Sequence, residues 1–144
     1  MRQLLWTCVG SLFLCSPAWA VLGGDLASVR GDALAWNASI SQSALSGATL
    51  HSLLLPNGVT VREYVDAAGT VFAVAWEGPV QPDFVRLLGS SFAIYQEALR
   101  KPGRSVGVNN ADLVLESGGR MRAFHGRAYL PARLPAALST RDIR

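Results

Sequence analysis

Hydrophobic and polar positions alternate most regularly between residues 48 and 76, where three short runs are separated by turn residues. Alternation with a period of two is typical of a half-buried β-strand. The runs cover residues 50–55, 59–65 and 70–76. Asn57-Gly58 lies between the first two runs, and both residues tolerate the positive φ angles of a tight hairpin turn. The pattern therefore predicts a three-stranded antiparallel meander.

The second turn of this meander suggests a register for its strands. A three-residue loop ending in Gly69 would pair Val65 with Val71 and Tyr64 with Phe72. One face then carries Val61, Val65, Val71, Ala73 and Ala75, and the other carries Tyr64, Phe72, Val74 and Trp76. Both faces are largely apolar, so we expect both to be at least partly covered. The aromatic face could be a sugar- or peptide-binding platform, but a place in the core is the favoured interpretation.

Residues 83–100 have the helical spacing of a single long helix, which Pro102-Gly103 would end. The apolar positions with this spacing are Phe84, Leu87, Leu88, Tyr95, Ala98 and Leu99. Residues 25–36 predict a shorter helix with Asp25 as its N-cap, although Gly31 weakens it. Residues 39–47 are polar and are interpreted as a loop.

A second hairpin is predicted from residues 112–116 and 120–125, joined by a loop at 117–119. This register pairs Glu116 with Arg120 and places Leu113, Leu115, Met121 and Ala123 on one face. The order of elements predicts an α+β fold. Its antiparallel sheet would be a three-stranded meander plus a C-terminal hairpin, packed against one main helix.

The first 20 residues have the three parts of a secretory signal peptide. Arg2 is followed by an uncharged apolar run at 4–15, and small residues precede a predicted cut after Ala20. A membrane anchor is the alternative, but the run is shorter than the ~20 residues that span a bilayer. We therefore expect a single exported α+β domain at 21–144, with a less regular segment at 21–47 and no transmembrane segment after cleavage. The predicted location is outside the cytoplasm.

Composition excludes several function classes. Both cysteines, Cys8 and Cys15, lie in the predicted leader, so the exported part would have no thiol for a disulfide or a nucleophile. The formal net charge of +3 is too small and too dispersed to predict nucleic-acid binding. No cofactor motif is present, and the two histidines lack metal-ligand spacing, so we predict neither a cofactor nor a metal.

Arginines provide the most plausible binding residues. Arg120, Arg122 and Arg127 lie close together in the sequence, and guanidinium groups bind carboxylate and phosphate in bidentate fashion. The partners we expect are envelope polysaccharide, a lipid headgroup or another envelope protein. The competing interpretation is a solvated strand face on which Glu116 neutralises Arg120.

Histidines are weak catalytic candidates, and we predict no catalytic residue. His51 or His125, with Glu63 or Asp112, could serve a small periplasmic hydrolase. No Gly-x-Ser-x-Gly elbow accompanies them, and a structural role is more common for such residues. A non-enzymatic envelope protein that binds an anionic ligand or a protein partner is therefore the first hypothesis, and the hydrolase is the alternative.

Two longer segments resemble a known family. They read LPNGVTVREYVDAAGTVFAVAWEGP at 55–79 and SGGRMRAFHGRAYLP at 117–131. Together with the leader, Leu22-Gly23-Gly24 and the closing Asp142-Ile143-Arg144, they resemble an uncharacterised family of bacterial exported proteins, domain-of-unknown-function family 2844. The resemblance implies a bacterial origin and an address in the periplasm or beyond. It implies no activity, cofactor or catalytic residue.

Overall fold

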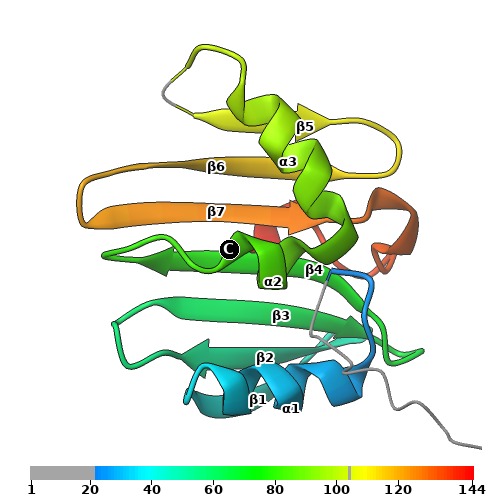
Figure 1. Ribbon diagram of the computed structural model, residues 1–144. Coiled ribbons are helices and arrows are strands. Elements are labelled where there is room, and N and C mark those ends of the chain that lie inside the picture. The colour runs from blue at the N-terminus through cyan, green and yellow to red at the C-terminus, as the bar shows by residue number, and fades with distance from the viewer. Residues whose placement is uncertain (1–21, 104) are drawn as a thin grey trace, which may run out of the picture.

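The computed structural model describes residues 22–103 and 105–144 (Figure 1). The predicted signal peptide at 1–20 and its cleavage at Ala20 lie outside these residues. The described residues form a seven-stranded sheet in the order β1-β2-β3-β4-β7-β6-β5, with each neighbouring pair antiparallel. The strands are β1 Ser39–Leu45, β2 Ala48–Leu54, β3 Thr60–Asp66, β4 Val71–Gly78, β5 Val106–Asn109, β6 Val114–Arg120 and β7 Ala123–Tyr129.

The α+β class fits broadly, but the predicted architecture is wrong. The meander and the hairpin are one sheet because β4 pairs with β7, from Ala73 opposite Tyr129 to Gly78 opposite Phe124. Two edge strands, β1 and β5, were not predicted, and β1 comes from the segment at 39–47 that was interpreted as a loop. β1 is exposed along most of its length, so it lacks the apolar alternation that marks a half-buried strand. β5 has only four residues.

The helices also differ from the prediction. Helix α1 spans Leu26–Ala35, and its Asp25 cap is confirmed because the Asp25 side chain accepts a hydrogen bond from the Ser28 amide. The predicted long helix is broken into α2 Phe84–Leu88, the 3-10 turn η1 Gly89–Ser91 and α3 Phe92–Leu99. Gly89 has a φ of 48°, which is outside the helical range and accounts for the break.

The sheet has two unlike faces (Figure 1). Helices α1, α2 and α3 lie on one face, which we call the helix face. The chain after β7 crosses the other, which we call the tail face, through the short turns η2 Pro131–Arg133 and η3 Thr140–Asp142. Buried side chains form a cluster on each face. The larger includes Val61, Val74, Trp76, Leu87 and Leu115, and the smaller includes Tyr64, Phe72, Ala73, Tyr129 and Ile143.

A register shift separates the three aromatic residues of the meander. Val65 pairs with Val71 as predicted, but Tyr64 pairs with Ala73 rather than with Phe72. The extra residue is a β-bulge, which reverses the facing of every later β4 residue. Trp76 therefore lies in the helix-face core, while Tyr64 and Phe72 lie in the tail-face core. All three are buried, so they form no exposed platform.

The second hairpin has a different turn from the predicted one. β6 continues through the predicted Ser-Gly-Gly loop to Arg120, which pairs with Ala123. The turn is Met121-Arg122, where Arg122 has a φ of 65° and Met121 is 90% exposed.

Gly126, inside β7, allows the side chain of Trp76 to pack directly against the backbone of this strand. A Cβ at Gly126 would lie 2.3 Å from Cζ2 of Trp76, so the indole occupies the space that a side chain would fill.

The described part of the chain contains no helix that is both long and apolar enough to cross a membrane.

Candidate functional site: a charged trough on the tail face

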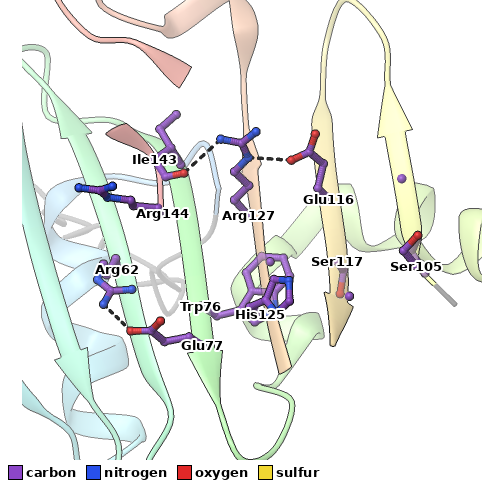
Figure 2. Close-up of a pocket in the computed structure, with 14 residues that line it drawn as sticks. Arg62, Trp76, Glu77, Ser105, Glu116, Ser117, His125, Arg127, Ile143 and Arg144 are labelled. Atoms are coloured by element: carbon purple, nitrogen blue, oxygen red, sulfur yellow. Dashed lines mark hydrogen bonds and ion pairs between the residues drawn. The ribbon is translucent and has the colours of Figure 1, made fainter. Parts of the chain in front are cut away.

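The tail face carries a trough of about 540 Å³ that runs across β4, β7, β6 and β5 (Figure 2). Trp76, Gly126 and Ser117 are paired neighbours in this row, and Trp76 belongs to the helix-face core. Their backbones therefore form the floor of the trough. Gly107 and Gly118 also line it, and neither has a side chain to fill it. No side chain therefore fills the trough at these two positions.

Two ion pairs flank this floor (Figure 2). Nη2 of Arg62 on β3 lies 2.5 Å from Oε1 of Glu77 on β4. Nε of Arg127 on β7 lies 2.8 Å from Oε2 of Glu116 on β6. In both pairs the glutamate side chain is more than half exposed and the arginine about one-quarter exposed. Each arginine therefore keeps part of its guanidinium accessible.

Arg127 also holds the C-terminal tail. Its Nη1 donates hydrogen bonds to the carbonyl oxygens of Thr140 and Ile143, at 2.5 and 3.3 Å. The Tyr64 hydroxyl lies 3.1 Å from the amide nitrogen of Arg144, and the Ile143 side chain is 1% exposed. These contacts place Ile143 and Arg144 along one side of the trough. Arg127 thus has a structural role in addition to any role in binding.

The structure distributes the three predicted arginines along the β6–β7 hairpin. Arg120 ends β6, Arg122 lies in the turn and Arg127 lies within β7. Arg127, rather than Arg120, forms the ion pair with Glu116. Within residues 22–103 and 105–144, neither Arg120 nor Arg122 makes an ion pair. The register places Arg120 and Arg127 on the same face, about 13 Å apart along the strand.

His125 is exposed on the tail face beside Glu77, its cross-strand partner. On the other side its neighbour is Gly118, and Ser105 follows beyond it. Two strand spacings, about 9.5 Å, therefore separate the backbones of His125 and Ser105. A serine and its general base need contact at about 3 Å. Asp112 lies six residues before Gly118, about 20 Å along the strand. This row of residues forms no nucleophile–base pair.

A model of a protein family, described as "Protein of unknown function (DUF2844)", matches residues 18–143. The chain belongs to the DUF2844 family. No curated protein and no solved structure gave a significant match. The family resemblance found in the sequence is thus confirmed, and the family itself carries no assigned activity.

Other polar groups of this DUF2844 chain are buried on the helix face. His51 on β2 and Glu63 on β3 are cross-strand partners, and they are 6% and 1% exposed. Asp32 of α1 is fully buried and lies 3.3 Å from Nη1 of Arg86. Burial, with a contribution from the charge of Asp32, raises the pKa of Glu63 to about 8. Burial, together with the positive charge of Arg30, lowers the pKa of His51.

These shifts make His51 and Glu63 an uncharged pair at neutral pH. Nε2 of His51 and both carboxyl oxygens of Glu63 are buried, and no described residue gives them a hydrogen bond. His51 with Glu63 was one of the alternative histidine–carboxylate combinations considered for a hydrolase, and the structure places these two residues side by side in the sheet. It does not join them by a hydrogen bond, so the geometry lacks the contact that a catalytic pair requires.

The sequence did not single out three charged residues of the DUF2844 trough. Arg62 and Glu77 belong to the meander and Arg144 to the tail, and the trough exists only because β4 pairs with β7. The one sequence signal is that Arg62 alternates with apolar residues in β3, which predicts an outward side chain. The described residues contain no group of three or more histidine, cysteine or acidic side chains that could hold a metal ion.

Proposed function

We propose that this protein works outside the cytoplasm as a non-enzymatic binding protein, and that the tail-face trough takes a ligand bearing carboxylate or phosphate groups. One observation carries the proposal. Three arginines, Arg62, Arg127 and Arg144, line the trough against two glutamates, Glu77 and Glu116, and Arg120 lies on the same face beyond the lining. The local charge is therefore positive.

The chemistry of the arginines supports an anionic ligand. A guanidinium is always charged and offers planar pairs of donors that match carboxylate and phosphate oxygens. Glu77 and Glu116 orient Arg62 and Arg127 without enclosing them, because these glutamates are more than half exposed. Arg120 lies about 13 Å beyond Arg127 on the same face, which suits a ligand with more than one acidic group.

The predicted leader supports the location. Export of a bacterial protein would bring the trough to envelope polysaccharides and to lipid headgroups, both of which carry carboxylate or phosphate groups. Fractionation of the native host tests this part, with an expected mature N-terminus at Val21 in the exported fraction. An intact Met1 on a cytosolic species would contradict it.

Binding is tested with two sources of anion. The purified protein is passed over a uronic acid polymer, with a neutral glucan as control, and is mixed separately with vesicles of phosphatidylglycerol or phosphatidylcholine. We expect retention on one acidic surface, weaker at high salt because exposed charges are screened. Replacing both Arg62 and Arg144, which line the trough, by alanine should weaken this binding roughly tenfold, since charge-assisted hydrogen bonds are lost.

The matched control is the double replacement of Arg100 and Lys101 by alanine, which removes the same charge at the end of α3. It should leave binding nearly unchanged. Equal losses in the two double variants would show only a response to net charge and would overturn the trough as the site. A failure to bind any of the acidic surfaces would overturn the proposed function.

A further inference from the structure

A second cavity lies on the helix face, between α1 and the β1–β3 side of the sheet. Its volume is about 820 Å³, within the range of roughly 300 to 1,000 Å³ typical of small-molecule sites. The sheet separates this cavity from the trough on the tail face, and the two share no lining residue. Ligand binding here would therefore be independent of the proposed function.

Exposed hydrophobic side chains surround the mouth of this cavity. Leu26 and Leu34 of α1 are 43% and 84% exposed, and Ile40 of β1 is 46% exposed. All three line the cavity, and Ala33 and Val65 lie among its more buried apolar lining. Folded proteins seldom leave several large apolar side chains exposed together unless they contact a ligand or partner.

The polar lining is as informative as the apolar lining. His51 lines the cavity although it is only 6% exposed, and no described residue provides a hydrogen bond to its buried Nε2. A buried polar atom without a partner is costly, so native proteins rarely retain one without a reason. The His51 side chain thus forms a polar part of the cavity wall, although its Nε2 itself is enclosed by protein.

Charge at this site favours an acidic ligand. Arg30 of α1 also lines the cavity, and its positive charge contributes to the lowered pKa of His51. Asp66 is the one carboxylate in the lining. Its side chain is already engaged, because it accepts hydrogen bonds from the amides of Ala68 and Thr70 and lies 3.6 Å from Nη1 of Arg133. Arg30 is left as the group that an anion would meet.

We propose that this cavity binds a small amphipathic carboxylic acid. The carboxylate lies between the Arg30 guanidinium and the His51 imidazole, and the hydrocarbon part packs against Leu26, Leu34 and Ile40. A neutral imidazole can donate one hydrogen bond, so it complements a carboxylate oxygen without adding a second buried charge. The apolar rim supplies affinity by removing hydrocarbon from water.

The test uses decanoate as the probe and decanol as its uncharged match, titrated into the intact purified protein. Calorimetry gives the affinity, and the imidazole NMR signals report the location. We expect one decanoate per chain to bind below its micelle concentration and to shift the signals of His51 but not those of His125. Arg30→Gln should weaken decanoate binding roughly tenfold and leave decanol binding unchanged.

Arg100→Gln is the matched control, because it removes an exposed arginine from the end of α3, outside the cavity lining, and should not alter either affinity. Arg30 is exposed, so its replacement should leave the fold intact, which thermal unfolding verifies. Equal affinities for decanoate and decanol, or equal effects of the two arginine replacements, would overturn the proposal. So would binding that shifts His125 alone, or association only with lipid vesicles.

The two proposals fail separately. The double replacement of Arg62 and Arg144 should leave decanoate affinity unchanged, and Arg30→Gln should leave retention on acidic polymer unchanged. A decanoate affinity that falls with the Arg62 and Arg144 replacements would place decanoate in the trough and overturn the cavity as its site.

Discussion

The two faces of the sheet treat acidic side chains in opposite ways. On the tail face, Glu77 and Glu116 are more than half exposed, and each contacts an arginine. On the helix face, Glu63 is 1% exposed, and no described residue gives its carboxyl oxygens a hydrogen bond. Water and an arginine keep the first two charged at little cost. Burial keeps Glu63 protonated, with a pKa of about 8.

The acidic groups of the two faces therefore differ in their effect on the stability of the fold. Exposed ion pairs contribute little to stability and can be replaced, whereas a buried acid lowers stability unless something compensates for it. Perturbed ionisable groups of this kind concentrate at functional sites. The helix face therefore has the more unusual chemistry, although the tail face has the more accessible charges.

The strongest test of the comparison is Glu63→Gln. An unfolded Glu63 loses its proton near pH 4.5, and the folded protein holds it to about pH 8. Between these values the folded state binds more protons, so the free energy of unfolding falls as pH rises, by at most about 1.4 kcal/mol per pH unit. Glutamine cannot ionise, so the variant should lack this fall, which amounts to up to about 4 kcal/mol between pH 5 and 8.

Urea unfolding at several pH values measures this effect as the difference between the two proteins. Glu77→Gln is the control from the tail face, because it makes the same chemical change at an exposed carboxylate. A Glu63→Gln variant whose stability changes with pH in parallel with the original protein would show that Glu63 is ionised in the folded state.

A second test concerns the packing that separates the faces. Gly126→Ala adds a Cβ only 2.3 Å from Cζ2 of Trp76 and 2.5 Å from the carbonyl oxygen of Glu116. We expect a loss of about 3 kcal/mol in the free energy of unfolding, because the indole must leave its place in the helix-face core. Gly107→Ala is the matched control, since its Cβ meets nothing within 4 Å. Equal stability of the two variants would contradict the role of Gly126.

A third test concerns the tail that covers the opposite face. The Tyr64 hydroxyl lies 3.1 to 3.2 Å from the carbonyl oxygens of Asp142 and Arg144 and 3.1 Å from the Arg144 amide nitrogen. Tyr64→Phe should cost about 1 kcal/mol and speed hydrogen exchange at 139–144. Tyr129→Phe is the control from the same face. Unchanged exchange at 139–144 in the Tyr64 variant would show that Arg127 and Ile143 suffice to hold the tail.

The smallest expected effect is the coupling between Arg62 and Glu77. A double-mutant cycle with Arg62→Gln and Glu77→Gln should give about 0.5 kcal/mol or less, falling with added salt, because the pair is solvated. A small coupling energy here would contrast with the large pH-dependent change in stability that is expected for Glu63→Gln. A coupling several times larger would mean that the tail face is less open to water than its exposed glutamates indicate.

Local pattern predicted the interior of the fold better than its edges. Strands 60–66 and 71–78 and the Asp25 cap were recognised because apolar alternation and capping chemistry act over a few residues. β1 was missed because a solvated edge strand has no buried side to mark it. The long helix was predicted without its break, since the pattern continues across Gly89.

The candidate site was less accessible to prediction than the fold. Arg127 was identified from its place among other arginines. Its contacts with Glu116 and the tail depend on the observed pairing of β6 with β7, whose turn is Met121-Arg122 rather than the predicted loop at 117–119. His51 and Glu63 were named among alternative histidine and carboxylate candidates, without a reason to expect burial. The covering helix α1, which is distant in sequence, makes them a buried pair.

The sequence by itself determined the family, the α+β class, most strands of the meander and the chemical types available for binding. The tertiary structure alone decided that β4 joins β7, that a bulge sends Trp76 and Tyr64 to opposite faces, and which carboxyl groups meet water. The physical reason is range. Alternation and capping depend on neighbours a few residues away, whereas burial, pKa and the shape of a cavity depend on segments that meet only when the chain folds.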